Sequence, residues 1–155
     1  NERVADLVKG VPPFPRVREV LERFAERADL IVVSQTPHEA LVREWNEHDL
    51  DGPIRLIAGQ ELGTKTEHIE RVSRGRYRPE RMLVIGDAPG DRKAAKANNA
   101  LFYPILPGAE EESWERLHDE GIDRFFERTY AGGYEAQRIA DFDRCLPERA
   151  PWVDA

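Results

Sequence analysis

The sequence predicts an α/β protein with a Rossmann-like parallel sheet and helices on both faces. Two observations predict this fold class. Short apolar runs such as LIVV, RLIA and MLVI show no apolar/polar alternation, which is typical of strands covered on both faces. Each run is followed by a segment with helical periodicity, and this alternation favours parallel strands joined by crossover helices.

The elements follow one another without internal repeats. Residues 2–10 form a helical pattern, which VPPFP at 11–15 interrupts because proline cannot continue a helix. Residues 16–28 then repeat apolar side chains at helical spacing, from Val17 to Phe24, as expected for an amphipathic helix. The further predicted helices are 37–50, 64–75, 89–99, 111–122 and 134–146, and the predicted strands are 28–34, 53–59, 81–87 and 100–105.

The composition predicts one soluble globular domain. Of 155 residues, 40% are hydrophobic and 34% are charged. No apolar run approaches the roughly 20 residues of a membrane span, and no signal-peptide pattern is seen, so we expect a cytoplasmic protein with no membrane partner. The single cysteine, Cys145, excludes an internal disulfide. The net charge of −7, with arginines interleaved among glutamates, argues against nucleic-acid binding.

Polar and charged residues follow the predicted strands at the points where each strand ends. Ser34 and Gln35 follow LIVV, Lys65 begins a helix after RLIA, and Asp87 and Asp91 flank the turn GDAPGD after MLVI. Ligands gather at the carboxyl ends of parallel strands. Carboxylate oxygens are usual ligands of Mg²⁺, and a hydroxyl can bind a phosphoryl oxygen. A lysine can neutralise the negative charge between the carboxylates and the phosphoryl group.

This set resembles motifs two, three and four of the haloacid dehalogenase superfamily of phosphatases, in order and rough spacing over residues 16–106. The resemblance implies that Ser34, with Gln35 beside it, binds the phosphoryl group and that Lys65 is catalytic. It also implies that Asp87 binds Mg²⁺ and that Asp91 binds or orients the metal. The substrate would be a small phosphorylated metabolite; neither its identity nor the oligomeric state is indicated.

One motif of the superfamily is missing. The first motif carries the nucleophilic aspartate on a central strand, and residues 1–29 contain no strand ending in Asp-x-Asp. We therefore expect residues 1–15 to be the end of a cap domain and its hinge, and residues 16–155 to be the C-terminal part of the core. An alternative is a degenerate relative in which the two flanking strands pair directly.

The resemblance implies hydrolysis of a phosphomonoester through an aspartyl-phosphate on an upstream aspartate, so this polypeptide alone is expected to be inactive. Two other classes stay open. One is a non-catalytic binding or regulatory module that kept the fold and lost the nucleophile. The other is a receiver-like signalling domain, which fits less well because its acids come early in the chain.

Purely structural roles stand beside these interpretations. Ser34, Thr36 or Asp87 could cap the following helix, and Asp91 could complement a helix dipole. The four histidines lack metal-binding spacing and are expected at the surface: His38, His48, His68 and His118. The C-terminal aromatics could form a stacking surface, although packing on the sheet is favoured: Phe125, Phe126, Tyr130 and Tyr134.

Overall fold

A computed structural model describes residues 12–146 of the chain. Its strands are β1 (Leu30–Val33), β2 (Ile54–Ala58), β3 (Leu83–Gly86) and β4 (Leu101–Pro104). Its α-helices are α2 (Val17–Ala25), α3 (His38–Glu47), α4 (Lys65–Ser73), α5 (Pro89–Ala97), α6 (Glu110–Arg116), α7 (Ile122–Phe126) and α8 (Gly133–Cys145). Short 3₁₀ turns are η1 (Gln60–Leu62) and η2 (Pro79–Arg81), and a π-helical turn, η3 (Leu117–Gly121), joins α6 to α7.

The predicted order of strands and helices from residue 16 to residue 105 is confirmed, and so is the last helix, α8. The single helix expected at 111–122 is instead α6 and a π-helical turn, and α7 follows it without having been predicted. The helix expected at residues 2–10, and with it most of the predicted cap-and-hinge segment, lies outside the described residues. No helix within residues 12–146 is long and apolar enough to cross a membrane.

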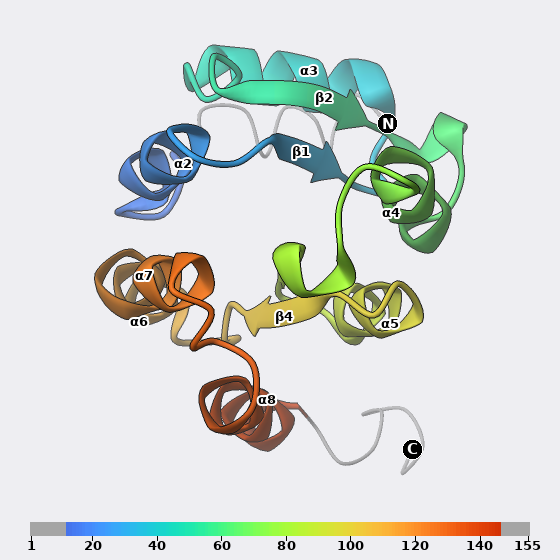
Figure 1. Ribbon diagram of the computed structural model, residues 1–155. Coiled ribbons are helices and arrows are strands. Elements are labelled where there is room, and N and C mark those ends of the chain that lie inside the picture. Colours follow the sequence, from blue (N-terminus) through green and yellow to red (C-terminus); the bar gives the residue numbers. More distant parts are fainter. Residues whose placement is uncertain (1–11, 147–155) are drawn as a thin grey trace, which may run out of the picture.

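The strands form two small parallel sheets and not one. β1 pairs with β2, with Val32 opposite Ile57, and β3 pairs with β4, with Val84 opposite Phe102. Figure 1 shows the β1–β2 pair in the upper half of the molecule and β4 in the lower half. The α/β class and the parallel pairing are confirmed, whereas a continuous sheet is not formed. Direct pairing of the two motif-bearing strands, β1 and β3, is likewise not formed among the described residues.

Helices cover both sheets and also hold them together. α3 packs against β2, while α5 and α8 pack against β4. α2 packs against β1 and also against α7, and α4 packs against β1 and also against α5. Because α2 and α4 each contact elements of both halves, the two sheets share one folded unit.

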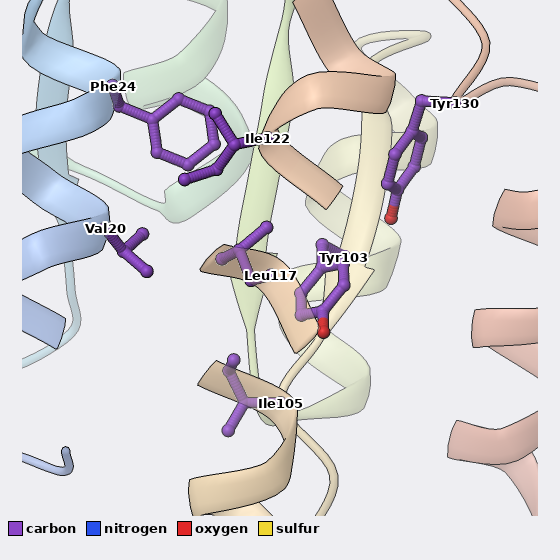
Figure 2. Close-up of a cluster of buried hydrophobic side chains, with 7 residues drawn as sticks. All are labelled: Val20, Phe24, Tyr103, Ile105, Leu117, Ile122 and Tyr130. Atoms are coloured by element: carbon purple, nitrogen blue, oxygen red, sulfur yellow. The ribbon is translucent and has the colours of Figure 1, made fainter. Parts of the chain in front are cut away.

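The main core lies where α2 meets the C-terminal helices. Val20 and Phe24 of α2 face Leu117 and Ile122 in Figure 2, and all four are buried. These apolar side chains recur at helical spacing, so burying one face of α2 also fixes its orientation. The cluster also contains Tyr103, Ile105 and Tyr130.

Two buried tyrosines satisfy their hydroxyl groups by bonding to the main chain. The Tyr103 hydroxyl donates to the carbonyl of Ser113 at 2.6 Å, and the Tyr130 hydroxyl donates to the carbonyl of Phe102 at 2.7 Å. Burial raises the pKa of both phenols. Phe125 and Phe126 pack against Phe24 of α2, and Tyr134 packs against Tyr130, which contacts Tyr103 of β4. The C-terminal aromatics therefore join the core at α2 as well as at the sheet.

Two structural expectations are wrong. His68, expected at the surface, is only 3% exposed, because α4 lies between β1 and α5. The alternative that Thr36 and Asp87 cap the following helices is also wrong: α3 and α5 both begin without a side-chain cap, and Asp91, inside the first turn of α5, accepts the N–H of Ala88.

Candidate functional site

Lys65 is held at the first turn of α4 by a capping box. The Thr64 hydroxyl accepts a hydrogen bond from the Glu67 N–H at 3.2 Å, and the Glu67 carboxylate accepts one from the Thr64 N–H at 2.9 Å. This second bond lowers the pKa of Glu67. The reciprocal bonds satisfy two N–H groups that the helix cannot pair, so they fix the residue at which α4 begins.

From that position the Lys65 side chain reaches Asp91. The Lys65 Nζ lies 2.5 Å from Asp91 Oδ1, and the two side chains are 26% and 12% exposed. The pair joins α4, which follows β2, to α5, which follows β3. Two residues that are 26 positions apart in sequence therefore meet in one ion pair, between a helix that follows one sheet and a helix that follows a strand of the other.

The other oxygen of Asp91 binds the turn after β3. Asp91 Oδ2 accepts hydrogen bonds from the N–H groups of Asp87 at 3.2 Å and Ala88 at 3.1 Å. Gly86 makes room for this carboxylate, since a Cβ there would lie 2.3–2.5 Å from the Asp91 side chain. The spacing of the GDAPGD turn thus has a local physical cause: Gly86 lets Asp91 fold back onto the end of the strand.

Asp87 presents a different carboxylate. It is exposed at the end of β3, and its side chain has no hydrogen bond or ion pair to the residues that the structure describes. Asp87 and Asp91 are therefore adjacent in space and unequal in role. Both oxygens of Asp91 already have partners, whereas those of Asp87 are open to solvent.

A Mg²⁺ ion at this turn would have few protein ligands. No group of three or more His, Cys, Asp or Glu within the described ranges could hold a metal. Mg²⁺, however, is commonly bound through one or two carboxylates, with water and phosphate completing its coordination. Asp87 would hold the ion, and Asp91, through its bond to the Asp87 N–H, would orient the residue that holds it.

Ser34 and Gln35 form part of a tight loop after β1. The Ser34 N–H donates to the Ala58 carbonyl at 3.0 Å, and its hydroxyl accepts from the Thr36 N–H at 3.1 Å. The Gln35 amide donates to the Gly63 carbonyl at 3.3 Å, next to the cap of α4. The loop after β1 is thereby tied to the loop that leads to Lys65.

The structure joins some predicted site residues and leaves others apart. Lys65, Asp91 and the main chain of Asp87 are in direct contact. No hydrogen bond among residues 12–146 links Ser34 or Gln35 to that group. A surface hollow of about 470 Å³ is lined by residues of α3 and includes none of the predicted site residues.

Sequence reasoning missed four residues of this region: Thr64, Glu67, Gly86 and His68. Thr64 and Glu67 could have been found, because Thr-x-x-Glu before a helix is a capping signal. Gly86 was noted only as part of a motif. A glycine just before a turn, with an acid a few residues later, could have indicated that the acidic side chain lies against the glycine. His68 gave no signal, yet both of its ring nitrogens are buried without a partner in the described structure.

Comparisons with protein-family models, with curated proteins and with solved structures find no match to this chain.

Proposed function

We propose that this chain is the core portion of a Mg²⁺-dependent phosphomonoester hydrolase with a single Rossmann-like core, resembling the haloacid dehalogenase superfamily. One observation carries the proposal. Lys65, Asp91 and the Asp87 main chain form a bonded group at the end of β3, although they come from two helices and a strand end. A lysine with only a structural role on a helix surface would not require an ion pair with an acid of a second helix.

Each residue has a defined task in the proposed chemistry. Asp87 would hold Mg²⁺, which when bound supplies positive charge against the phosphoryl oxygens. Lys65 is a compact cation whose first-turn position is fixed by the α4 cap, and it would neutralise charge between the acids and the phosphoryl group. Ser34 would offer its hydroxyl to a phosphoryl oxygen, and Gln35 would hold the loop in place through Gly63.

The nucleophile would come from outside this sequence. An aspartate on an additional strand would attack phosphorus, form an aspartyl-phosphate and release the alcohol, and water would then cleave the aspartyl-phosphate. The substrate would be a small phosphorylated metabolite in the cytoplasm. The polypeptide described here would hold the cation and the acids and would not turn over substrate alone.

The test uses the complete protein with p-nitrophenyl phosphate and Mg²⁺. Asp87→Asn should abolish Mg²⁺-dependent turnover and keep the fold, as judged by circular dichroism, and the exposed acid change Glu80→Gln should leave turnover unchanged. Lys65→Ala should lower turnover by about 10²–10³-fold, the usual cost of one electrostatic stabiliser. Lys93→Ala, on the exposed face of α5, is its matched control.

Unchanged turnover in Asp87→Asn would remove the metal assignment, and a loss below threefold in Lys65→Ala would make Lys65 a structural residue. If the complete protein has no Asp-x-Asp after an apolar strand and no turnover, the second class follows. The chain would then be a non-catalytic module in which the same ion pair only stabilises the fold.

A further inference from the structure

An exposed, strongly basic segment lies between α4 and β3. Residues 74–81 read RGRYRPER, and every one of them is exposed to solvent. In Figure 1 they belong to the light-green connection that leads from α4 to the lower half of the molecule. This stretch holds a single acid, Glu80, although the whole chain has 30 acidic and only 23 basic residues. We call residues 74–81 the arginine segment, and its arginines are Arg74, Arg76, Arg78 and Arg81.

Three of these arginines have no acidic partner in the described part of the chain. Arg74 lies 3.9 Å from Glu70, and no ion pair within residues 12–146 involves Arg76, Arg78 or Arg81. Elsewhere on the surface, arginines of α2, α5 and α8 pair with aspartates. The positive charge of the arginine segment is therefore available to an anion from outside, and guanidinium groups bind phosphates and carboxylates through paired hydrogen bonds.

The main chain of the arginine segment is already fixed. The N–H groups of Arg76 and Tyr77 donate to the Ser73 carbonyl at 2.9 Å and 3.1 Å, and the Arg81 N–H donates to the Arg78 carbonyl at 2.9 Å. A ligand would therefore have to order arginine side chains but not a loop, which lowers the entropy cost of binding.

Tyr77 anchors the middle of the segment. Its hydroxyl donates to the carboxylate of Asp29, which directly precedes β1, and Arg55 of β2 pairs with the other oxygen of that carboxylate at 2.9 Å. Because Arg55 balances the charge of Asp29, this acid does not neutralise Arg76 or Arg78. Tyr77 is still 40% exposed, so part of its ring faces solvent between the two arginines.

An exposed aromatic ring among arginines is typical of surfaces that bind single-stranded nucleic acid. Bases stack on the ring while the cations hold the phosphates, and no particular base sequence is required because every base has a π-face. The Tyr77 hydroxyl already has a partner, so Tyr77 offers a ligand its ring and not a hydrogen bond.

The net negative charge of the chain narrows the choice of anionic partner. An anionic bilayer is a broad surface that would also meet, and be repelled by, the acidic remainder of the molecule. A single strand needs to touch only the arginine segment, and at physiological salt charges more than about 8 Å away are largely screened. An acidic polypeptide would pair with the arginines but would make no use of the Tyr77 ring. Our expectation of no nucleic-acid binding came from the charge of the whole chain, and that average hides this segment.

We propose that the arginine segment binds a short stretch of single-stranded nucleic acid. The guanidinium groups of Arg76, Arg78 and Arg81 contact its phosphates, and the Tyr77 ring stacks on a base. The segment is tied to the residue before β1 and leads into the start of β3, whereas the candidate site follows the ends of these strands. The inference therefore does not depend on the proposed hydrolysis.

Fluorescence anisotropy of a fluorescein-labelled uridine dodecanucleotide, titrated with the 155-residue chain, tests the proposal. We expect a dissociation constant of about 10⁻⁴ M or lower at about 50 mM NaCl. Three phosphate contacts give a slope of about −2 in a plot of log K against log salt concentration. Raising NaCl to about 200 mM should therefore weaken binding by roughly twentyfold.

Matched variants separate the arginine segment from the net charge of the chain. Arg76→Gln combined with Arg78→Gln should reduce the slope to about −0.7, because one phosphate contact remains. Arg43→Gln combined with Lys93→Gln removes the same charge at exposed positions outside the segment and should bind like the unchanged chain. Tyr77→Leu should weaken binding at least about fivefold through the loss of stacking, whereas Tyr77→Phe keeps the ring and most of the binding. Circular dichroism checks that each variant is folded.

Several results would overturn the proposal. Absence of saturable binding at low salt would show that the arginines are only solvated. Equal losses in the two double variants would mean that only net charge matters, and unchanged binding in Tyr77→Leu would exclude the stacked base. The partner would be an acidic polypeptide if a dodecaglutamate peptide displaced the labelled strand at a lower concentration than the unlabelled strand does. It would be an anionic membrane if phosphatidylserine vesicles did so.

Discussion

Replacing Gly86 with alanine should lower the free energy of unfolding of the chain, and should lower it more than the same change at Gly90. An alanine Cβ would lie 2.3 Å from Asp91 Cβ and 2.4 Å from its Cγ, so Asp91 or the strand end has to move. Overpacking of this kind costs about 1–3 kcal/mol, and the displaced carboxylate also loses its cap of α5, which is worth about 1 kcal/mol. We expect a total loss of at least about 2 kcal/mol in the free energy of unfolding.

Gly90 is the matched control, because it lies four residues later in α5 and a Cβ there meets nothing within 4 Å. Gly90→Ala should leave stability unchanged or raise it by up to about 1 kcal/mol, since alanine is the better helix former. The assay is urea unfolding at pH 7. With a denaturant slope of about 2 kcal/mol per molar, Gly86→Ala should lower the midpoint by about 1 M.

Equal midpoints for Gly86→Ala and Gly90→Ala would refute the reasoning, because they would show that Asp91 does not lie against Gly86. A double variant separates the cause. In the background of Asp91→Gly, which removes the side chain that the new Cβ would meet, Gly86→Ala should cost at least about 1 kcal/mol less than in the wild-type chain.

Two further predictions concern the cap of α4 and the buried tyrosines. Thr64→Ala should lower stability by about 1 kcal/mol in urea unfolding while Thr64→Ser keeps most of it, because only the hydroxyl accepts the Glu67 N–H; equal losses would exclude the cap. Burial raises the pKa of Tyr130 and Tyr103 in the folded chain above the value of about 10 in the unfolded chain. The native state then holds protons that the unfolded state releases, so the contribution of these two tyrosines to stability should be constant below about pH 10 and should fall as the pH rises above it. In Tyr130→Phe the thermal midpoint should fall less steeply between pH 10 and 11.5, and an identical slope would show that Tyr130 does not contribute.

Local patterns predicted the elements well, because each depends on neighbours in sequence. The helix from Val17 to Ala25 follows from apolar spacing, and the turn after β3 follows from glycine, proline and acid at short range. For Lys65 and Asp91 we expected only that both lie at one end of a sheet. Their direct contact could not be predicted, because the distance between the starts of two helices depends on how the strands before them are arranged and not on the sequence of either helix.

The cap of α4 by Thr64 and Glu67 is local, whereas the other features that sequence reasoning missed depend on packing between distant segments. His68 lies between Glu67 and Ile69 in a charged segment and therefore looks exposed, but α4 happens to pack between two halves of the molecule. Likewise, the cover of the β4 edge by Glu135 and Tyr130 joins residues that are about thirty positions from Phe102. No local periodicity encodes such pairs.

The position of Lys65 itself argues for a role beyond stability. The first turn of a helix carries partial positive charge, so a lysine there is disfavoured by about 0.3–1 kcal/mol, whereas Asp91 in the first turn of α5 is favoured by the same effect.

Replacing Lys65 and replacing Asp91 should therefore change the free energy of unfolding by different amounts. Lys65→Met removes the misplaced cation and leaves Asp91 bonded to two N–H groups, so it should change the free energy of unfolding by less than about 1 kcal/mol. Asp91→Ala strands a partly buried lysine and opens the cap of α5, and should cost about 2 kcal/mol or more. Urea midpoints of the two variants measure the difference. Equal losses would mean that the ion pair is held for stability, whereas the expected asymmetry leaves binding of an anionic ligand as the reason that a cation is kept at this helix start.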